Sequence, residues 1–283
     1  MAETTRRARQ PKAQEKPAPV VQQDVKVTVQ DGPKPDIFAT IPPEETVAII
    51  IPMYEMTKDG LVPAVNYQML EVALLRLRSY FHKTFKIFVG EKTRTTDEAL
   101  GVVQGHLAAK NALLVDTDEF ATLGMYIQDG LEAAKQHTTS KYFIVATPWQ
   151  MVGNASVDVL LERSNKVDVG IVSGFDVRSA GVAPADFDTY KFNPPREFRA
   201  LDINFWCITR AVADSLVIDP KYQTQEILQR DIFQLMHARG YNVIQSQQAP
   251  IYTFAIDWTP AEGEKELAED KEYFKSKWGF IPL

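Results

Sequence analysis

The residues of this sequence that could do chemistry are mainly acidic. Two D-x-D triplets, Asp116-Thr117-Asp118 and Asp186-Phe187-Asp188, could each offer two carboxylates to a divalent cation. Acidic residues are common in loops, so neither triplet predicts a metal site by itself. Cys207 lies in an apolar segment without a histidine close by, which favours a buried core thiol over a nucleophile. No Walker A or G-x-G-x-x-G run is present, and the histidines follow no metal-ligand spacing: His82, His106, His137 and His237.

Composition limits the class of protein. The chain has 283 residues, 45% of them hydrophobic, and a net charge of −6, which argues against nucleic acid as the main partner because phosphate binding needs clustered Lys and Arg. A single cysteine cannot form an intramolecular disulfide. No apolar run is long enough for a membrane span, and no hydrophobic segment follows the basic N-terminus as in a signal peptide. We therefore expect a cytoplasmic protein, or part of an assembly that is made in the cytoplasm.

Residues 1–45 differ from the rest of the chain. They hold seven of the 17 prolines and one aromatic residue, Phe38. Such a segment cannot bury enough surface to offset its ordering entropy, so we expect a flexible tail or an arm that orders on a protein partner. Residues 23–30 alternate well enough to add as a strand to the edge of a partner's sheet. The predicted domains are therefore an N-terminal arm, 1–45, and one folded domain, 46–283.

The folded part predicts an α/β fold. Residues 47–52 are apolar without alternation, as in a strand whose two faces are both buried in a parallel sheet. Strand and helix patterns then alternate up to about residue 173, which predicts right-handed βαβ units, a mostly parallel sheet and helices on both of its faces. The pattern lapses into a loop over residues 174–201 and resumes with a strand near residue 205.

In this order, the chain resembles the family-2 nucleotide-sugar glycosyltransferases, which have the Rossmann-like GT-A fold. Residues 47–55 are similar to the family's "V-S-I-I-I-P-x-Y-N", and residues 85–97 to its "F-E-I-I-V-V-D-D-G-S-T-D". Residues 128–131 with Ala134 resemble "N-x-G-L-x-x-A", and residues 238–241 resemble "R-x-x-G-Y". Lys277-Trp278-Gly279 also recurs in such enzymes. The resemblance covers residues 46–280.

The resemblance implies a site for a nucleotide sugar of the UDP or GDP type. In the family, the end of the first strand and the acid after the second strand hold the base and ribose. Those positions are here Pro52, Tyr54, Glu55 and Glu91, with Asp97 at the start of the next helix. A carboxylate can accept hydrogen bonds from a base or from ribose hydroxyls, and a tyrosine can stack on a base. The alternative is that Glu55 and Glu91 are solvated acids in loops.

The sequence departs from the family at its metal motif. There, a D-x-D after the fourth strand holds Mg²⁺ or Mn²⁺, which neutralises the diphosphate leaving group. Here the fourth apolar segment, 142–146, continues as Thr147-Pro148-Trp149-Gln150, without a carboxylate. The resemblance thus implies Mg²⁺ or Mn²⁺, but its acidic ligands are missing and we predict no metal or other cofactor.

The sequence also departs from the family at the position of the catalytic base. Inverting members place an acid in an "E-D-x-D-L" run before the late helix, where it takes the proton of the acceptor hydroxyl. Counting back from residues 240–241 aligns Asp231 with the last D of this run. Leu228 and Gln229 then stand where the family has its first two acids, E-D. The candidate bases are therefore Asp231 and, as a lesser candidate before residue 205, Asp202.

Two functions follow from the sequence. The first is a glycosyltransferase that uses a nucleotide sugar, possible without a metal if Lys or Arg neutralises the diphosphate. The second is a catalytically inactive protein of the same fold with a binding or structural role, whose N-terminal arm joins it to a larger assembly such as a virion. Loss of the metal acids together with the acidic pair favours the second function, whereas fold-level likeness does not decide between them.

Overall fold

The structure is a computed structural model that describes residues 47–53, 55–57, 60–62, 67–77, 84–90, 97–108, 112–117, 121–254 and 264–282. The chain divides into one unit at residues 1–35 and another at 36–283, and every described residue belongs to the second. The predicted arm, residues 1–45, lies outside the described residues, so its flexibility and its partner stay predictions.

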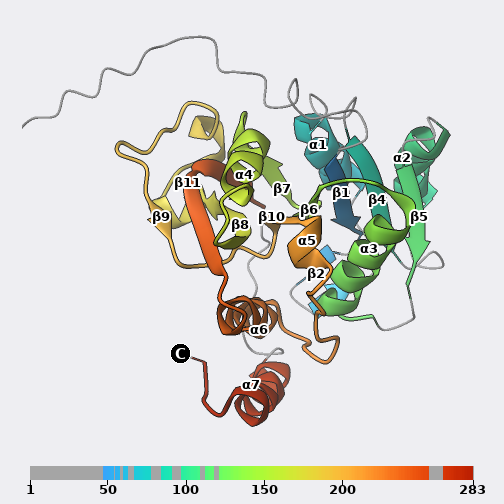
Figure 1. The fold of residues 1–283 in the computed structure, drawn as a ribbon. Coiled ribbons are helices and arrows are strands. Elements are labelled where there is room, and N and C mark those ends of the chain that lie inside the picture. The colour runs from blue at the N-terminus through green and yellow to red at the C-terminus, as the bar shows by residue number, and fades with distance from the viewer. Residues whose placement is uncertain are drawn as a thin grey trace, which may run out of the picture. The chain divides into compact units, whose positions relative to one another are not determined.

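A nine-stranded sheet lies at the centre of the second unit (Figure 1). Its strands follow the order β5-β4-β1-β6-β10-β8-β11-β7, and β9 pairs with β11. Their bounds are β1 Val47–Pro52, β4 Thr84–Gly90, β5 Ala112–Asp116, β6 Tyr142–Ala146, β7 Gln150–Val152, β8 Val169–Asp176, β9 Glu197–Phe198, β10 Phe205–Thr209 and β11 Asn242–Thr253. Two further strands, β2 Glu55–Thr57 and β3 Gly60–Val62, pair only with each other among the described residues.

The sheet is mostly parallel, as predicted. The strands β5, β4, β1 and β6 pair in parallel, and so do β8 and β11. The strand β10 is antiparallel to both of its neighbours, β6 and β8, and β7 is antiparallel to β11. The antiparallel β10 joins the two parallel groups of strands.

The strand β1 is buried over its whole length. Because side chains alternate along a strand, Ala48 and Ile50 belong to one hydrophobic core, while Ile49 and Ile51 belong to the core on the opposite face. This confirms the prediction, from six apolar residues without alternation, that both faces of the strand are covered.

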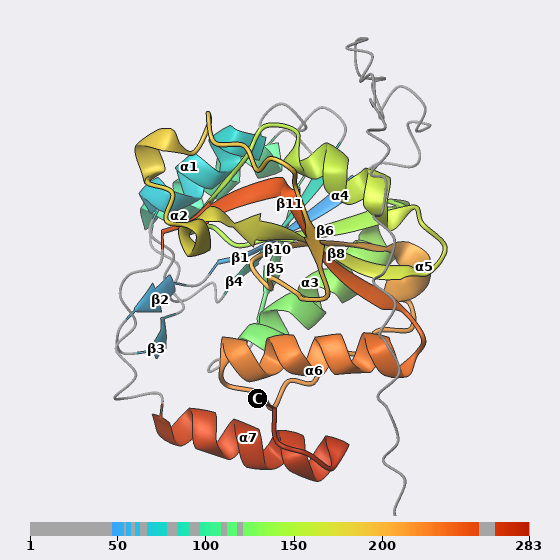
Figure 2. The ribbon, with the colours of Figure 1, turned by 90° about the vertical axis from the view of Figure 1, so that its left-hand side faces the viewer.

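Helices cover both faces of the sheet (Figure 2). On one face, α1 Tyr67–Leu77, α2 Asp97–Ala108 and α4 Ser156–Ser164 contribute to one core. On the other face, α3 Leu123–His137 and α6 Gln225–Ala238 contribute to the second core, to which the short helix α5 Arg210–Ala213 also belongs. The helix α7 Glu264–Trp278 packs on α6 on the side away from the sheet.

The helix α3 approaches β1 and β4 closely at Gly130. A methyl group built on Gly130 would overlap the side chain of Ile50 and would lie 3.1 Å from a methyl of Val89. Gly130 belongs to the stretch that resembles "N-x-G-L-x-x-A". The absence of a side chain there lets α3 pack directly against the centre of the sheet.

The segment predicted as a loop, 174–201, has local structure. It contains the 3₁₀ helices η3 Val177–Ala180 and η4 Pro184–Asp186 and the strand β9. Its buried residues Val177, Val182 and Phe187 form a small core with Met151. Arg76 of α1 ties this segment to the helix layer, because its guanidinium forms an ion pair with Asp188 at 2.7 Å.

Candidate functional site

The candidate site lies at the carboxyl edge of the parallel strands. The strands β1, β4, β6 and β8 all end at this edge, and the antiparallel β10 begins there, with Phe205 paired to Ala146. Open α/β sheets bind ligands outside the carboxyl ends of their strands. The segments that follow β6 and precede β10 therefore supply the side chains of interest.

The segment Thr147-Pro148-Trp149-Gln150 after β6 is buried, and Asn204 holds it in place. The backbone N–H of Thr147 donates to the carbonyl of Asn204 at 2.9 Å, and the amide of Gln150 donates to the same carbonyl. The indole N–H of Trp149 donates to the Asn204 side-chain oxygen at 3.3 Å. Trp149 belongs to the hydrophobic core on the α3 and α6 face, so this segment serves packing in the structure.

Asp202 lies two residues before Asn204 and is only partly buried. Its carboxylate accepts the backbone N–H of Asn204 at 2.9 Å, and its own N–H donates to the hydroxyl of Ser173 on β8 at 2.9 Å. Removal from water raises the pKa of Asp202 to about 6, to which the nearby charge of Asp176 adds, while the hydrogen bonds from Asn204 and the charge of Arg178 act against the rise. A carboxyl group with a pKa close to neutral suits general acid–base chemistry.

Asp176 and Arg178 lie beside Asp202 at the end of β8. The Asp176 carboxylate accepts from the Arg178 guanidinium at 2.6 Å and also from the Arg178 backbone N–H at 3.0 Å. The same edge therefore carries a partly buried acid together with a local ion pair in which the Arg178 side chain is 36% exposed.

The described residues do not fit a Mg²⁺ or Mn²⁺ site. No group of three or more His, Cys, Asp or Glu side chains lies together in the part of the chain that the structure describes. Thr147 and Gln150 have only neutral oxygens: the Thr147 hydroxyl and the Gln150 side-chain N–H both donate to Asn204, and the Gln150 side-chain oxygen is buried without a hydrogen-bond partner among the described residues. We therefore derive no chemical step through a metal.

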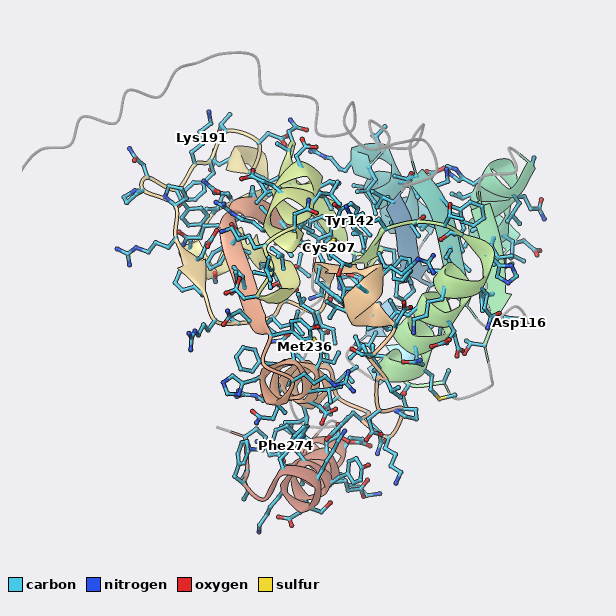
Figure 3. All side chains as sticks on the ribbon, viewed as in Figure 1. Asp116, Tyr142, Lys191, Cys207, Met236 and Phe274 are labelled. Carbon is cyan, nitrogen blue, oxygen red and sulfur yellow. The ribbon has the colours of Figure 1, made fainter. Side chains whose placement is uncertain are left out.

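Neither D-x-D triplet lies in the segment between β6 and β7, and the second triplet has an acid that is already paired. Asp116 is exposed at the end of β5, at the outer edge of the sheet and away from Tyr142 and Cys207 (Figure 3). Asp118 lies outside the described residues. In the second triplet, Phe187 is buried and Asp188 is paired with Arg76.

Asp231, the first candidate base, lies inside α6 and is 1% exposed. One carboxylate oxygen accepts from the Tyr222 hydroxyl at 2.9 Å and from the Trp278 indole N–H at 2.7 Å, and the other accepts from Lys277 at 2.9 Å. This network links α6 to α7, so the geometry favours a structural role. The predicted catalytic role of Asp231 stays a prediction.

A second carboxylate from α7 supports the start of α6. Asp270 is buried and accepts the backbone N–H of Thr224 at 2.7 Å and the Thr224 hydroxyl at 2.6 Å. Thr224 is the N-cap residue of α6 and its own side chain makes no capping bond, whereas the Asp270 carboxylate accepts the backbone N–H groups of Gln223 and Thr224 just before the first turn.

The predicted nucleotide-binding residues are only partly described. Pro52 is buried at the end of β1, at the candidate edge, and Asp97 is exposed as the first residue of α2. Glu55 lies in β2, of which the structure describes the backbone. Tyr54 and Glu91 lie outside the described residues. The nucleotide contacts of these five positions stay predictions.

Sequence reasoning missed Asn204, Asp176 and Arg178. Asn204 acts on residues more than 50 positions away in the chain, and no local pattern marks such a contact. A signal did exist for Asp176 and Arg178, because both follow a strong apolar strand at its carboxyl end. Cys207 is buried in β10, as predicted, and its burial raises the pKa of the thiol to about 12.

The fold matches solved glycosyltransferases of the GT-A class. A mannosyltransferase, PcManGT from Pyrobaculum calidifontis, solved with GDP-Man and Mn²⁺, is 13% identical with a TM-score of 0.57 over 84% of this chain and 66% of its own. GalNAc-T7, solved with UDP, GalNAc and Mn²⁺, is 12% identical with a TM-score of 0.57 over 82% of this chain and 50% of its own.

A third solved structure, S. aureus TarS 1–349 with UDP, is 10% identical with a TM-score of 0.54 over 84% of this chain and 67% of its own. This chain therefore spans about half to two thirds of these structures and has the GT-A fold, as the sequence predicted. No protein-family model and no curated protein matches the sequence. None of the helices that the described residues form has the length and apolar character to cross a membrane.

Proposed function

We propose that this chain binds a nucleotide sugar at the carboxyl edge of its sheet and transfers the sugar to an acceptor hydroxyl, with Asp202 as the base. The observation that carries the proposal is that the half-buried residue Asp202, whose pKa is raised to about 6 by removal from water, lies at the edge where such folds bind ligands. The GT-A fold, whose solved neighbours hold GDP-Man or UDP, gives the class of donor.

In this reaction, Asp202 takes the proton of the acceptor hydroxyl as the hydroxyl oxygen bonds to the anomeric carbon. The bond from that carbon to the diphosphate breaks, and the nucleoside diphosphate leaves with the electron pair. Arg178 brings a guanidinium group to the same edge, and guanidinium groups bind phosphate oxygens through paired hydrogen bonds. The proposed transfer therefore uses no carboxylate-bound metal.

The test is release of UDP or GDP from a panel of nucleotide sugars by the full chain, with an acceptor panel and with EDTA. Asp202→Asn removes the base and keeps the acceptor oxygen for Asn204, so we expect turnover to fall about 100-fold or more. Asp214→Asn, an exposed change outside the edge, should leave turnover unchanged. Turnover that is lost in EDTA, or that survives in Asp202→Asn, would reject the proposed mechanism.

A second candidate function is a non-catalytic binding protein of the same fold, and one observation favours it. Trp149 and Gln150, at the position of the family's metal motif, are folded into the core and bonded to Asn204. In this case residues 1–45 would join the domain to a larger assembly, such as a virion, made in the cytoplasm. Thermal-shift titration distinguishes the two functions: binding of UDP or GDP without any turnover supports the non-catalytic protein. Both candidate functions assume that the chain has no metal site, and a rise in melting temperature that requires Mn²⁺ would contradict that assumption.

A further inference from the structure

A cavity of about 620 Å³ lies between α6, the segment after α7 and the segment that leads into β10. Residues that line it include Arg199, Leu201, Gln229, Arg230, Phe233 and Phe280. Its volume falls within the range of small-molecule sites, which is about 300–1,000 Å³. Leu201 lines the cavity but the next residue, Asp202, does not, so the proposed catalytic group is not part of its wall.

One part of the cavity wall is aromatic. Phe233 comes from α6, Phe274 from α7, and Phe280 from the segment after α7. Phe274 is almost fully buried, and Figure 3 labels it on α7. The rings of Phe274 and Phe280 meet edge to face with their centroids 5.5 Å apart, while Phe280 remains 47% exposed. A largely exposed phenylalanine next to a cavity offers apolar surface that a ligand can cover.

The polar part of the wall is cationic. Arg199 and Arg230 both line the cavity, and none of the described residues that line it is acidic. Arg230 pairs with Glu226 at 3.3 Å, but both side chains are exposed and such pairs contribute little. Arg199 is exposed and has no hydrogen bond or ion pair to any described residue. The amide of Gln229 likewise has no partner among the described residues, so it can donate to a ligand.

We infer that this cavity binds a small molecule with an apolar body and an anionic group. The apolar body covers the phenylalanine wall, and the anionic group lies between the two guanidinium groups, which bind carboxylates and phosphates through paired hydrogen bonds. The volume and the mixture of aromatic rings with a few polar groups suit a small ligand rather than a macromolecule. This inference goes beyond the proposed sugar transfer and does not depend on it.

Calorimetric titration of the full chain with 1-naphthyl phosphate and octyl phosphate tests the inference. We expect at least one phosphate to bind with one-to-one stoichiometry and about tenfold more tightly than its neutral alcohol, 1-naphthol or octan-1-ol. Arg199→Ala should weaken the binding of that phosphate about tenfold. Phe280→Ala should weaken the binding of the phosphate and of the alcohol to a similar degree, because it removes only apolar surface.

Arg196→Ala is the matched control. Arg196 lies on the same segment as Arg199, and its substitution removes the same charge. Arg196 does not line the cavity, so this variant should bind the phosphate as tightly as the unchanged protein does. Arg199, Arg196 and Phe280 are exposed, so all three variants should fold, which circular dichroism checks. The inference is overturned if neither phosphate saturates, if the alcohols bind as tightly as the phosphates, or if Arg196→Ala weakens binding as much as Arg199→Ala.

Discussion

Asn204 donates its backbone N–H to the carboxylate of Asp202, and its oxygens accept four hydrogen bonds from residues 147–150. One residue thus connects the acid at the sheet edge with the buried segment that follows β6. The side-chain oxygen of Asn204 is the acceptor for Trp149 and Thr147, and both donors are buried.

Asn204→Ala should therefore lower the free energy of unfolding by about 1–3 kcal/mol, because it leaves buried donors without an acceptor. Urea denaturation followed by tryptophan fluorescence measures the change and also reports on Trp149. The matched control is Asn154→Ala, since Asn154 is exposed, and it should change stability by less than about 0.5 kcal/mol. Equal effects of the two variants would contradict the role of Asn204.

Asp202 should make stability depend on pH. Its pKa of about 6 lies above the ordinary value of 3.8, so the folded protein holds the proton more strongly than the unfolded chain does. The contribution of Asp202 is most favourable below pH 4 and is lost as the pH rises from about 4 to about 6. Asp202→Asn should remove this loss, so at pH 7 the variant should be more stable than the unchanged protein by about 1–3 kcal/mol.

Urea denaturation of both proteins at pH 4 and pH 7 measures the difference, which should be small at pH 4. A variant that is less stable at pH 7 would show that the ionised carboxylate stabilises the fold. Paired with the turnover assay, this experiment tests whether the group that costs stability is the group that supports activity.

Two glycine-to-alanine changes should have opposite signs. Gly130→Ala would place a methyl group onto Ile50 of β1 and should destabilise the protein by about 1–3 kcal/mol through overpacking. Gly105 lies exposed in α2 with open space around it, so Gly105→Ala should stabilise by about 0.5–1 kcal/mol through helix propensity. Thermal denaturation of the two variants beside the unchanged protein checks both signs, and a stabilising Gly130→Ala would refute the close approach of α3.

Lys277→Ala should destabilise the protein by about 2 kcal/mol, because it leaves the buried Asp231 without its cation. The hydrogen bonds from Tyr222 and Trp278 remain and limit the loss. Lys275→Ala, which removes an exposed lysine on the same helix, should change stability by less than about 0.5 kcal/mol. Chemical denaturation measures the free energy of unfolding of both variants. Equal losses would show that the Lys277–Asp231 pair does not stabilise the packing of α6 on α7.

The parts of the fold that could be predicted carry strong local patterns. The runs that became β1 and β6 are apolar without alternation, and the amphipathic pattern of α3 marks its buried face. Nothing within Phe205–Thr209 encodes that β10 runs against its neighbours, because direction depends on the path of the preceding segment. The strand β11 runs from Asn242 to Thr253, and a register shift before Pro250 interrupts its pattern.

The site was harder to predict than the fold because its contacts join distant parts of the chain. Arg76 and Asp188 are 112 residues apart, and Asn204 meets Trp149 across 55 residues. The family resemblance predicted a site at this edge of the sheet and a metal motif without its acids, and both stay predictions. It could not show that residues 147–150 are held in the core by an asparagine from the turn before β10.

The link between Asp231 and α7 also bears on how the chain matures on the ribosome. Asp231 emerges 46 residues before Lys277 and 47 before Trp278, so a growing chain contains α6 before it contains the partners of this carboxylate. Burying the acid earlier would be costly, so α6 should dock onto the sheet only after α7 has emerged. Until then the apolar face of the sheet that α6 covers stays open, and a chaperone would have its longest opportunity to bind there.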